Sequence, residues 1–296
     1  MAEREGIVVR RHGGHYYVDT GDAIVDCTIR GRVKRRRAES DLIAVGDRVR
    51  WTPIEGGRGI IERVLPRRTV LSRTPPPPRA PIEQVIVANP DQVLVVMAMA
   101  SPPPNPFMLD RYLVACEAVA LPALIVANKI DLADGAADDA RELFALYEGL
   151  SYGVYYTSAT TGQGVDALRD VLRGKLSVLT GPSGTGKSSL LNALWPDLEL
   201  RTGEVSAYHD RGRHTTVVAQ LLRPERDTYV ADTPGLRQFR FWDIDPEQLE
   251  AFFPEFRPFL GECRFQPCTH THEPDCAIRA AAERGAVPPL RYESYV

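Results

Sequence analysis

Two short motifs of this chain stand in an unusual order. Residues 128–131 read N-K-I-D, and residues 181–188 read G-P-S-G-T-G-K-S. The second pattern is typical of a phosphate-binding loop, and the first is typical of the segment that reads guanine in GTPases, where it normally follows the loop. Because each motif works only when it is folded against the other, the reversed order predicts a circularly permuted GTPase domain rather than two chance matches.

The phosphate-binding motif lies between an apolar segment, 175–180, and a predicted helix, 188–194, which is the setting that such a loop requires. Its glycines let backbone amides turn toward phosphate oxygens, Lys187 places a charge on the β- and γ-phosphates, and the Ser188 hydroxyl binds Mg²⁺. The nucleotide-binding residues that we predict here are Gly181, Pro182, Ser183, Gly184, Thr185, Gly186, Lys187, Ser188 and Ser189.

Guanine selectivity is predicted from the earlier motif. Asp131 can accept hydrogen bonds from the N1 and N2 donors of guanine, a pair that adenine lacks, while Asn128 and Lys129 brace the base and the phosphate loop. Ser158 and Ala159 come at the end of the next predicted strand and resemble the third base-binding segment of GTPases. We therefore expect GTP and GDP, rather than adenine nucleotides, as ligands.

Two further segments are predicted to sense the γ-phosphate. Residues 232–235 read D-T-P-G after the predicted strand 228–231, so Asp232 can hold Mg²⁺ through water and Gly235 can offer its amide to the γ-phosphate. Residues 212–216 read G-R-H-T-T and fit a switch loop whose threonine hydroxyl completes the Mg²⁺ shell. We favour Thr216 over Thr215 for this role, and the sequence leaves both open.

The residue after Gly235 is Leu236, where many GTPases carry a glutamine that orients the attacking water. An apolar side chain cannot do this, and His214 is the nearest candidate, although a solvated or structural histidine is an equal alternative. We predict His214, Lys187 and Thr216 as catalytic residues, and slow intrinsic hydrolysis that a partner accelerates by ordering the switch loop.

Near the C-terminus, Cys263, Cys268, His270 and Cys276 supply three thiolates and one imidazole within 14 residues. This set is sufficient for one closed, tetrahedral and therefore structural Zn²⁺ site. His272 is an alternative ligand, and reduced cysteines without metal are an alternative to the site itself. The surrounding segments, 249–259 and 277–284, predict a small helical domain.

The N-terminal third predicts a small barrel, because five short alternating segments are separated by turns: 6–10, 15–19, 23–29, 47–52 and 59–64. Residues 1–73 carry 16 Lys and Arg against 10 Asp and Glu, a net charge of +6, whereas the whole chain has −3. The run Arg30–Arg37 falls in a barrel loop and favours RNA binding over a merely solvated loop. The proline-rich segment 74–81 then predicts a stiff linker, with a ligand for a proline-binding domain as a weaker alternative.

Strands alternate with helices through the middle of the chain, which predicts a parallel sheet covered on both faces. The longest apolar run, 93–100, is too short to span a bilayer. We expect a cytoplasmic, monomeric protein with no membrane partner. The expected strands are 92–97, 123–127, 153–157, 175–180 and 228–231, and the expected helices are 109–120, 137–146, 165–172 and 188–194.

The order of the motifs resembles that of the circularly permuted, small-ribosomal-subunit-dependent GTPase family. Along the chain the motifs are N-K-I-D, S-A, G-P-S-G-T-G-K-S, G-R-H-T-T, D-T-P-G and C-x4-C-x-H-x5-C. The likeness covers nearly the whole chain. It implies an OB-fold RNA-binding barrel at 1–73, a permuted GTPase domain at 74–238 and a zinc-binding domain at 239–296. It also implies binding to the 30S subunit through 16S rRNA in late maturation, stimulation of GTP hydrolysis by the subunit, and release afterwards.

Two departures from that family pattern concern RNA affinity and the switch loop. Many members carry a long basic N-terminal extension, whereas here the barrel begins almost at Met1, and Val217 stands where a third threonine is common. Two other functions stay open. One is a nucleotide-gated RNA-binding module in which hydrolysis only resets binding. The other, which the basic barrel disfavours, is a permuted GTPase that acts on protein or membrane partners.

Overall fold

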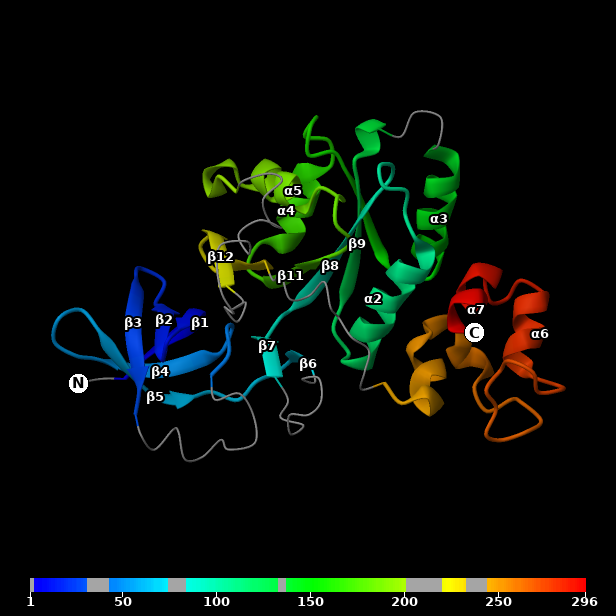
Figure 1. Ribbon diagram of the computed structural model, residues 1–296, viewed down its shortest axis with the longest axis horizontal. Coiled ribbons are helices and arrows are strands. Elements are labelled where there is room, and N and C mark those ends of the chain that lie inside the picture. Colours follow the sequence, from blue (N-terminus) through cyan, green and yellow to red (C-terminus); the bar gives the residue numbers. More distant parts are fainter. Residues whose placement is uncertain (1–2, 31–42, 74–83, 133–136, 201–219, 233–243) are drawn as a thin grey trace.

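The computed structural model describes residues 3–30, 43–73, 84–132, 137–200, 220–232 and 244–296. Three units lie along its long axis, a barrel at the N-terminal end, an α/β unit in the middle and a small helical unit at the C-terminal end (Figure 1). This arrangement confirms the predicted multidomain architecture. Among the described residues, no helix combines the length and apolarity needed to cross a membrane.

The N-terminal unit is a closed barrel with strand order β1-β2-β3-β5-β4. Its inward side chains alternate along the strands and form a buried core that includes Val8, Val18, Val49, Trp51 and Ile61. The five predicted strands are confirmed with ends that shift by at most two residues: β1 (Arg4–His12), β2 (His15–Asp19), β3 (Ile24–Ile29), β4 (Arg48–Pro53) and β5 (Gly59–Val64). The basic run Arg30–Arg37 lies almost wholly outside the described residues.

A two-stranded hairpin, β6 (Val70–Arg73) and β7 (Gln84–Ala88), joins the barrel to the central unit and was not expected from the sequence. The proline-rich segment 74–81 falls between its strands and outside the described residues. Gly46, just before β4, has φ +88°, and a Cβ there would lie 2.0 Å from the carbonyl oxygen of Ala88. Glycine is thus required where the barrel meets this hairpin.

The central sheet has strand order β10-β9-β8-β11-β13-β12. All neighbouring pairs are parallel except β12 and β13, which form an antiparallel hairpin across a two-residue turn in which Asp227 has φ +58°. The five strands that the sequence predicted for this sheet are parallel as expected, and β12 is an additional antiparallel edge strand that the sequence did not predict. The strands are β8 (Gln92–Ala98), β9 (Ala123–Asn128), β10 (Gly153–Thr157), β11 (Leu176–Thr180), β12 (Gln220–Glu225) and β13 (Thr228–Asp232).

Helices cover both faces of this sheet, as the sequence predicted (Figure 1). The alternation along β8 places Val93, Val95 and Met97 on the face covered by α2 and α3, and Leu94 and Val96 on the face covered by α4 and α5. The helical segments are α2 (Pro106–Ala118), η1 (Ile130–Leu132), α3 (Ala137–Gly149), α4 (Val165–Leu172), α5 (Lys187–Leu194) and η2 (Pro196–Leu198).

The C-terminal unit is built from short helices around a phenylalanine-rich core, in which the rings of Phe253 and Phe256 stack with centroids 5.0 Å apart. Val114 of α2 belongs to the same buried cluster, so this core continues into the central unit. The predicted helix at 277–284 is present, whereas α7 was not expected. The segments are η4 (Pro246–Phe252), η5 (Pro254–Phe259), α6 (Ala277–Glu283) and α7 (Pro289–Tyr295).

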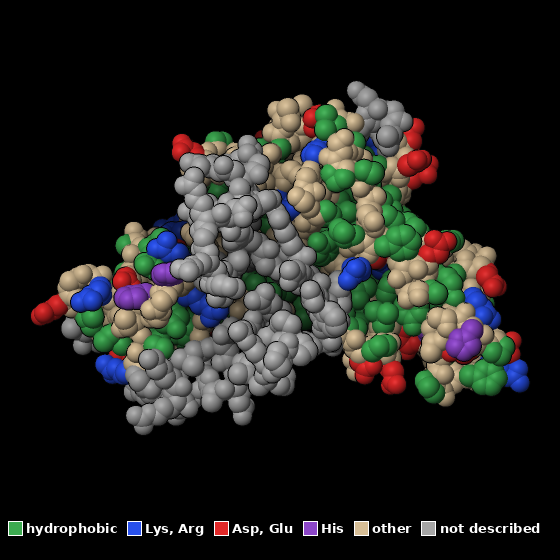
Figure 2. All heavy atoms as spheres, viewed as in Figure 1, with side chains coloured by type: hydrophobic (Ala, Val, Ile, Leu, Met, Phe, Trp, Pro, Cys, Tyr) green, Lys and Arg blue, Asp and Glu red, His purple; other side chains and the backbone are tan. Residues whose placement is uncertain are grey.

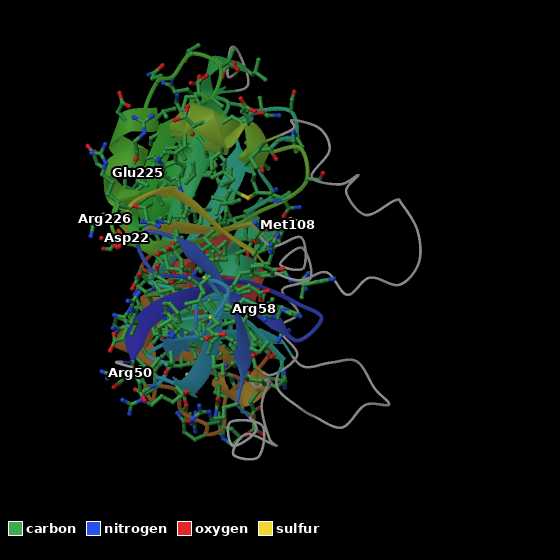
Figure 3. All side chains as sticks on the ribbon, turned by 90° about the vertical axis from the view of Figure 1, so that its left-hand side faces the viewer. Asp22, Arg50, Arg58, Met108, Glu225 and Arg226 are labelled. Carbon is green, nitrogen blue, oxygen red and sulfur yellow. The ribbon has the colours of Figure 1, made fainter. Side chains whose placement is uncertain are left out.

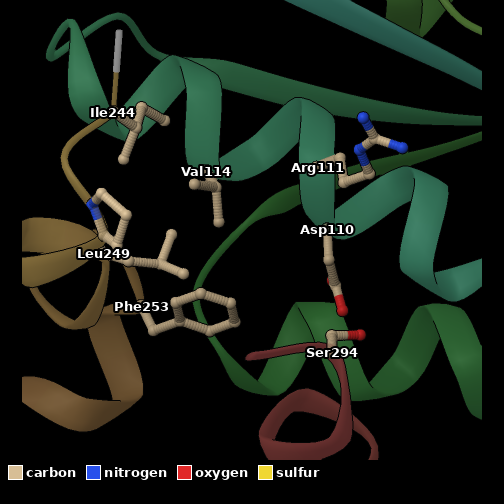
Figure 4. A pocket seen from close by; sticks show the side chains of 8 residues that line it. Asp110, Arg111, Val114, Ile244, Leu249, Phe253 and Ser294 are labelled. Carbon is tan, nitrogen blue, oxygen red and sulfur yellow. The ribbon is translucent and has the colours of Figure 1, made fainter. Parts of the chain in front are cut away.

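A buried charge cluster joins these two units. The Arg291 guanidinium on α7 is fully buried and pairs with Asp110 of α2 and with Glu255 of η5, the latter at 2.5 Å from Nε to Oε1. Tyr147 of α3 donates to Asp110 at 2.6 Å. Beside the cluster lies a cavity of about 260 Å³, where Asp110 and Ser294 point toward each other at one end, and its apolar lining includes Val114, Leu249 and Phe253 (Figure 4).

Candidate functional site

The nucleotide motifs meet at one edge of the central sheet, because parallel strands end on the same side. The N-K-I-D segment follows β9, Ser158 follows β10, and the glycine-rich loop 181–186 follows β11. Strand order places β8 between β9 and β11, with each pair in parallel register. The sheet therefore gathers motifs that are far apart in the sequence.

The glycine-rich loop has a backbone that only glycine adopts readily. Gly181, Gly184 and Gly186 have φ values of +134°, +82° and +85°. A Cβ at Gly181 would lie 2.1 Å from the Val96 carbonyl oxygen, and one at Gly186 would lie 2.6 Å from Asn128 Nδ2. The loop is thus packed against β8 and against Asn128 at the end of β9, and it leads directly into the first turn of α5.

Lys187, the first residue of α5, folds its side chain back over this loop. Its Nζ donates to the carbonyl oxygens of Gly181 at 2.9 Å and Pro182 at 2.6 Å. Thr185 is fully buried and donates through Oγ1 to the same Pro182 oxygen at 3.1 Å. The ammonium therefore lies against the backbone of the glycine-rich loop, which is the position from which a lysine neutralises bound phosphate.

Asn128 ties the N-K-I-D segment to the loop. Its side chain is fully buried, donates through Nδ2 to the Thr185 carbonyl oxygen at 2.9 Å, and accepts from Thr157 Oγ1 at 3.1 Å. Thr157, the last residue of β10, was not among the predicted site residues, and its position one residue before Ser158 was the available signal. The two motifs are thus held together by a buried hydrogen-bond chain rather than by proximity alone.

Asp131 and Ser158 also interact directly. Ser158 Oγ donates to Asp131 Oδ1 at 2.6 Å and accepts from the Thr161 amide at 3.0 Å, which fixes the orientation of the half-buried Asp131 carboxylate. Lys129 has φ +64°, and its Nζ donates to the Ser101 carbonyl oxygen. The loop after β8, which carries Ser101, therefore borders the site, a contact that the sequence reading missed although this loop also follows a central strand.

The structure gathers most of the predicted nucleotide residues, namely Asn128, Lys129, Asp131, Ser158, Ala159 and 181–189. Asp232 is the last residue of β13, at the same edge of the sheet, and its side chain is not described. His214, Thr215, Thr216 and Gly235 lie outside the described residues. Their predicted roles in hydrolysis and Mg²⁺ binding therefore rest on the sequence.

The second site is a cluster of sulfur and nitrogen atoms in the C-terminal unit. The potential ligand atoms of Cys263, Cys268, His270 and Cys276 all lie within 4.8 Å of one another. His270 Nδ1 is 3.5 Å from Cys263 Sγ and 3.3 Å from Cys276 Sγ. His272, the alternative ligand, is exposed and its Nδ1 pairs with the Thr271 hydroxyl instead. Three cysteines and one histidine in this arrangement can hold one metal ion.

Groups around the cluster orient its members. The other ring nitrogen of His270, Nε2, contacts the Glu250 carboxylate, and Tyr292 donates to the His270 carbonyl oxygen at 2.6 Å. The amide of Ala277, at the start of α6, donates to Cys263 Sγ at 3.4 Å. A carboxylate behind a histidine and an amide directed at a sulfur are common supports of metal ligands, because they fix the tautomer and favour the thiolate.

The barrel presents exposed cations on its outer surface (Figure 2). Arg10 stacks on Tyr17 with its guanidinium carbon 3.9 Å from the ring centroid, while Arg48 and Arg50 share the Glu5 carboxylate. Arg50 lies at the outline of the barrel in the side view (Figure 3), and Arg58 is also exposed. Single-stranded nucleic acids bind to surfaces that combine arginines with aromatic rings, because both groups can stack on bases.

Comparisons with known proteins agree with this geometry. A family model described as the RsgA GTPase matches residues 64–242, and one described as the RsgA N-terminal domain matches residues 5–61. The chain is 47% identical to a protein of Gemmatimonas aurantiaca over 98% of its own length and 95% of the relative's. It is 43% identical to a protein of Moorella thermoacetica over 99% and 95%. Both relatives are described as the small ribosomal subunit biogenesis GTPase RsgA.

Two solved structures are similar over almost the whole chain. YjeQ from Thermotoga maritima gives a TM-score of 0.80 at 38% identity, covering 99% of this chain and 96% of that structure. YloQ, described as a circularly permuted GTPase, gives a TM-score of 0.75 at 30% identity, covering 99% and 93%.

Proposed function

Because this chain belongs to the RsgA family of circularly permuted GTPases and is a GTP hydrolase, we propose that it acts in the biogenesis of the small ribosomal subunit. In this proposal it binds the 30S subunit through 16S rRNA, is stimulated by the subunit and leaves after hydrolysis. The main support for a guanine-nucleotide site is the buried hydrogen bond from Asn128 to the Thr185 carbonyl, which joins the guanine motif to the phosphate loop.

Guanine selectivity follows from Asp131. Its Oδ1 accepts from Ser158, so the carboxylate stays oriented, and its oxygens can accept hydrogen bonds from the two adjacent donors of guanine. Asn128 and Lys129 support the base and the loop, and Ser158 and Ala159 complete the base site. The same carboxylate repels the acceptor that adenine presents at N1, which disfavours ATP.

Phosphate binding is the role of residues 181–189. Glycines at 181, 184 and 186 adopt positive φ values that let the loop turn its backbone amides toward the phosphates, and the Lys187 ammonium exchanges its carbonyl partners for β- and γ-phosphate oxygens. Ser188, Thr216 and Asp232 would hold Mg²⁺, whose charge offsets that of the triphosphate. Gly235 contributes its amide to the γ-phosphate.

Water positioning is assigned to His214, because Leu236 offers no hydrogen-bonding group. A partner that orders residues 212–216 would bring His214 and Thr216 to the γ-phosphate. The need for a partner to order this loop accounts for slow intrinsic GTP turnover and for its acceleration by the ribosomal subunit.

The remaining parts support this role. Cys263, Cys268, His270 and Cys276 form a set of soft donors that fits one Zn²⁺, and four protein ligands make that ion structural rather than catalytic. The barrel, with its net positive charge and its stacked Arg10, supplies rRNA contacts. We propose domain boundaries after residues 73 and 238, a cytoplasmic location and a monomeric state.

The proposal is tested by hydrolysis of GTP and of ATP with and without purified 30S subunits, with Lys187→Ala as the background control. We expect the subunit to stimulate GTP turnover only, and the Lys187→Ala protein to stay at background. Equal turnover of ATP would contradict the guanine assignment. An unchanged rate with 30S, at a GTP site shown to be filled, would remove the ribosomal subunit as activator.

A further inference from the structure

A single buried carboxylate links the barrel to the edge of the GTPase sheet. Asp19 is the last residue of β2, and its side chain is fully buried. Its Oδ1 accepts from Arg223 Nη1 of β12 at 2.8 Å, and its Oδ2 accepts from the Tyr229 hydroxyl of β13 at 3.0 Å. Arg223 also donates through Nη2 to the Gly21 carbonyl at 2.7 Å. One barrel residue therefore holds both strands of the β12–β13 hairpin.

This hairpin occupies a special place in the chain. Residues 220–232 stand between the two segments expected to sense the γ-phosphate, because 212–216 precede β12 and 232–235 begin at the end of β13. Tyr229 lies only three residues before Asp232, on a strand that pairs in register with β11, which leads into the phosphate loop. A shift of Tyr229 along its strand direction is therefore a shift of Asp232.

The turn of the hairpin is also connected to the helix that follows the phosphate loop. Glu225 at the end of β12 accepts from the Trp195 indole, one residue beyond α5, at 2.7 Å. Strand β12 also contacts β1 of the barrel. The hairpin thus contacts the barrel on one side and α5 on the other, as a physically continuous path between them.

The attraction between Arg223 and Asp19 is screened less by water than that of an ordinary surface ion pair. Arg223 is 24% exposed and Asp19 is not exposed at all, so water screens their attraction only partly. Burial and the neighbouring Asp19 charge raise the pKa of Tyr229, which keeps its hydroxyl protonated as a donor. Apolar contacts surround this cluster, since Ile7, Val9 and Tyr17 of the barrel pack in the same core as Leu221 and Tyr229.

We propose that Asp19 is a positioning residue through which a nucleic-acid partner bound to the barrel changes the activity of the GTPase centre. This inference rests on the proposed function, in which the 30S subunit is that partner. A partner that tilts the barrel pulls on Arg223 and Tyr229 together, and the hairpin carries the movement to both γ-phosphate segments. Asp19 touches neither nucleotide nor Mg²⁺ and acts only through β12 and β13.

The test compares GTP turnover with and without 30S subunits for the full-length wild type, Asp19→Asn and Tyr229→Phe, at saturating GTP. Tyr229→Phe keeps the ring in the core and removes one hydroxyl, so it stays informative if Asp19→Asn folds poorly. Asp47→Asn is the matched control. Asp47 is equally buried and bonds Arg67 at 2.7 and 2.8 Å, but this pair joins two segments that both precede the GTPase sheet in the chain.

We expect Asp19→Asn to lower the ratio of stimulated to basal turnover by between about 2-fold and 30-fold, the range for residues in a coupling network. Tyr229→Phe should lower it in the same direction by less, while basal turnover and 30S affinity in pelleting assays stay unchanged. Asp47→Asn should keep the wild-type ratio. The inference would be overturned, and the proposed function left standing, by either of two results. One is a wild-type ratio of stimulated to basal turnover for both Asp19→Asn and Tyr229→Phe, and the other is an equal fall of this ratio for Asp47→Asn. A wild type that 30S does not stimulate would overturn the proposed function, and the inference with it.

Discussion

Removing the Arg291 guanidinium should destabilise this protein far more than removing an exposed arginine at the same interface. Arg291 is fully buried, and its partners Asp110 and Glu255 are each 3% exposed. Burial alone would lower the pKa of Arg291, but its hydrogen bonds to Glu255 and the charge of Asp110 outweigh that effect and raise it. The guanidinium therefore stays charged, and Arg291→Met would leave two carboxylates buried without their cation.

The expected magnitude follows from this burial. Breaking a buried ion pair by removing one partner costs about 3–5 kcal/mol of unfolding free energy, because the remaining charge is left uncompensated. The matched control is Arg257→Met, since Arg257 of η5 pairs with Glu117 of α2 at 2.7 Å across the same two units but is 55% exposed. A pair of that kind contributes about 0–1 kcal/mol.

The assay is urea unfolding followed by far-ultraviolet circular dichroism, with the free energy extrapolated to water for each variant. Arg291→Lys should fall between the wild type and Arg291→Met, because lysine keeps the charge and loses the planar fork that reaches two carboxylates. Equal m values would show that the variants unfold by the same transition. Losses of similar size for Arg291→Met and Arg257→Met would refute the argument that burial sets the strength of this cluster.

Three further outcomes are expected. Gly186→Ala should abolish GTP binding measured by calorimetry, because a Cβ there meets Asn128 Nδ2 at 2.6 Å and the residue must adopt φ +85°; binding at wild-type affinity would contradict the loop argument. Asp131→Asn should weaken GTP binding about 10-fold or more, since a hydrogen bond to a charged group contributes about 1.5–3 kcal/mol, and should leave Mg²⁺ dependence unchanged. In native protein at pH 8, Cys27 and Cys116 should resist iodoacetamide, because burial raises the pKa of each thiol to about 12 and leaves almost no thiolate. Treatment with a metal chelator should add labelling at the three C-terminal cysteines alone, as read by mass spectrometry.

Local patterns in the sequence predicted most of the helices and strands and supplied the candidate residues for the nucleotide and metal sites. Alternating apolar residues along β1–β5 indicate strands with one buried face, and the apolar runs of β8, β9 and β11 indicate strands that are buried on both faces of a covered sheet. The same holds for the glycines of 181–186 and the spacing of Cys263 to Cys276, where short-range geometry limits what the backbone can do. These features depend on residues within about one element's length of each other.

The contacts between the three units could not be predicted from local sequence patterns. Arg223 and Asp19 are 204 positions apart, and Arg291 and Asp110 are 181 apart, so no periodicity relates them. The choice of His270 over His272 also needed the folded chain, because it depends on which ring reaches the three sulfur atoms. The sequence by itself determined the kind of chemistry at each site, through residue types and local spacing. Only the tertiary structure decided how the barrel, the GTPase sheet and the metal unit are joined, because those contacts form only when distant segments pack and exclude water together.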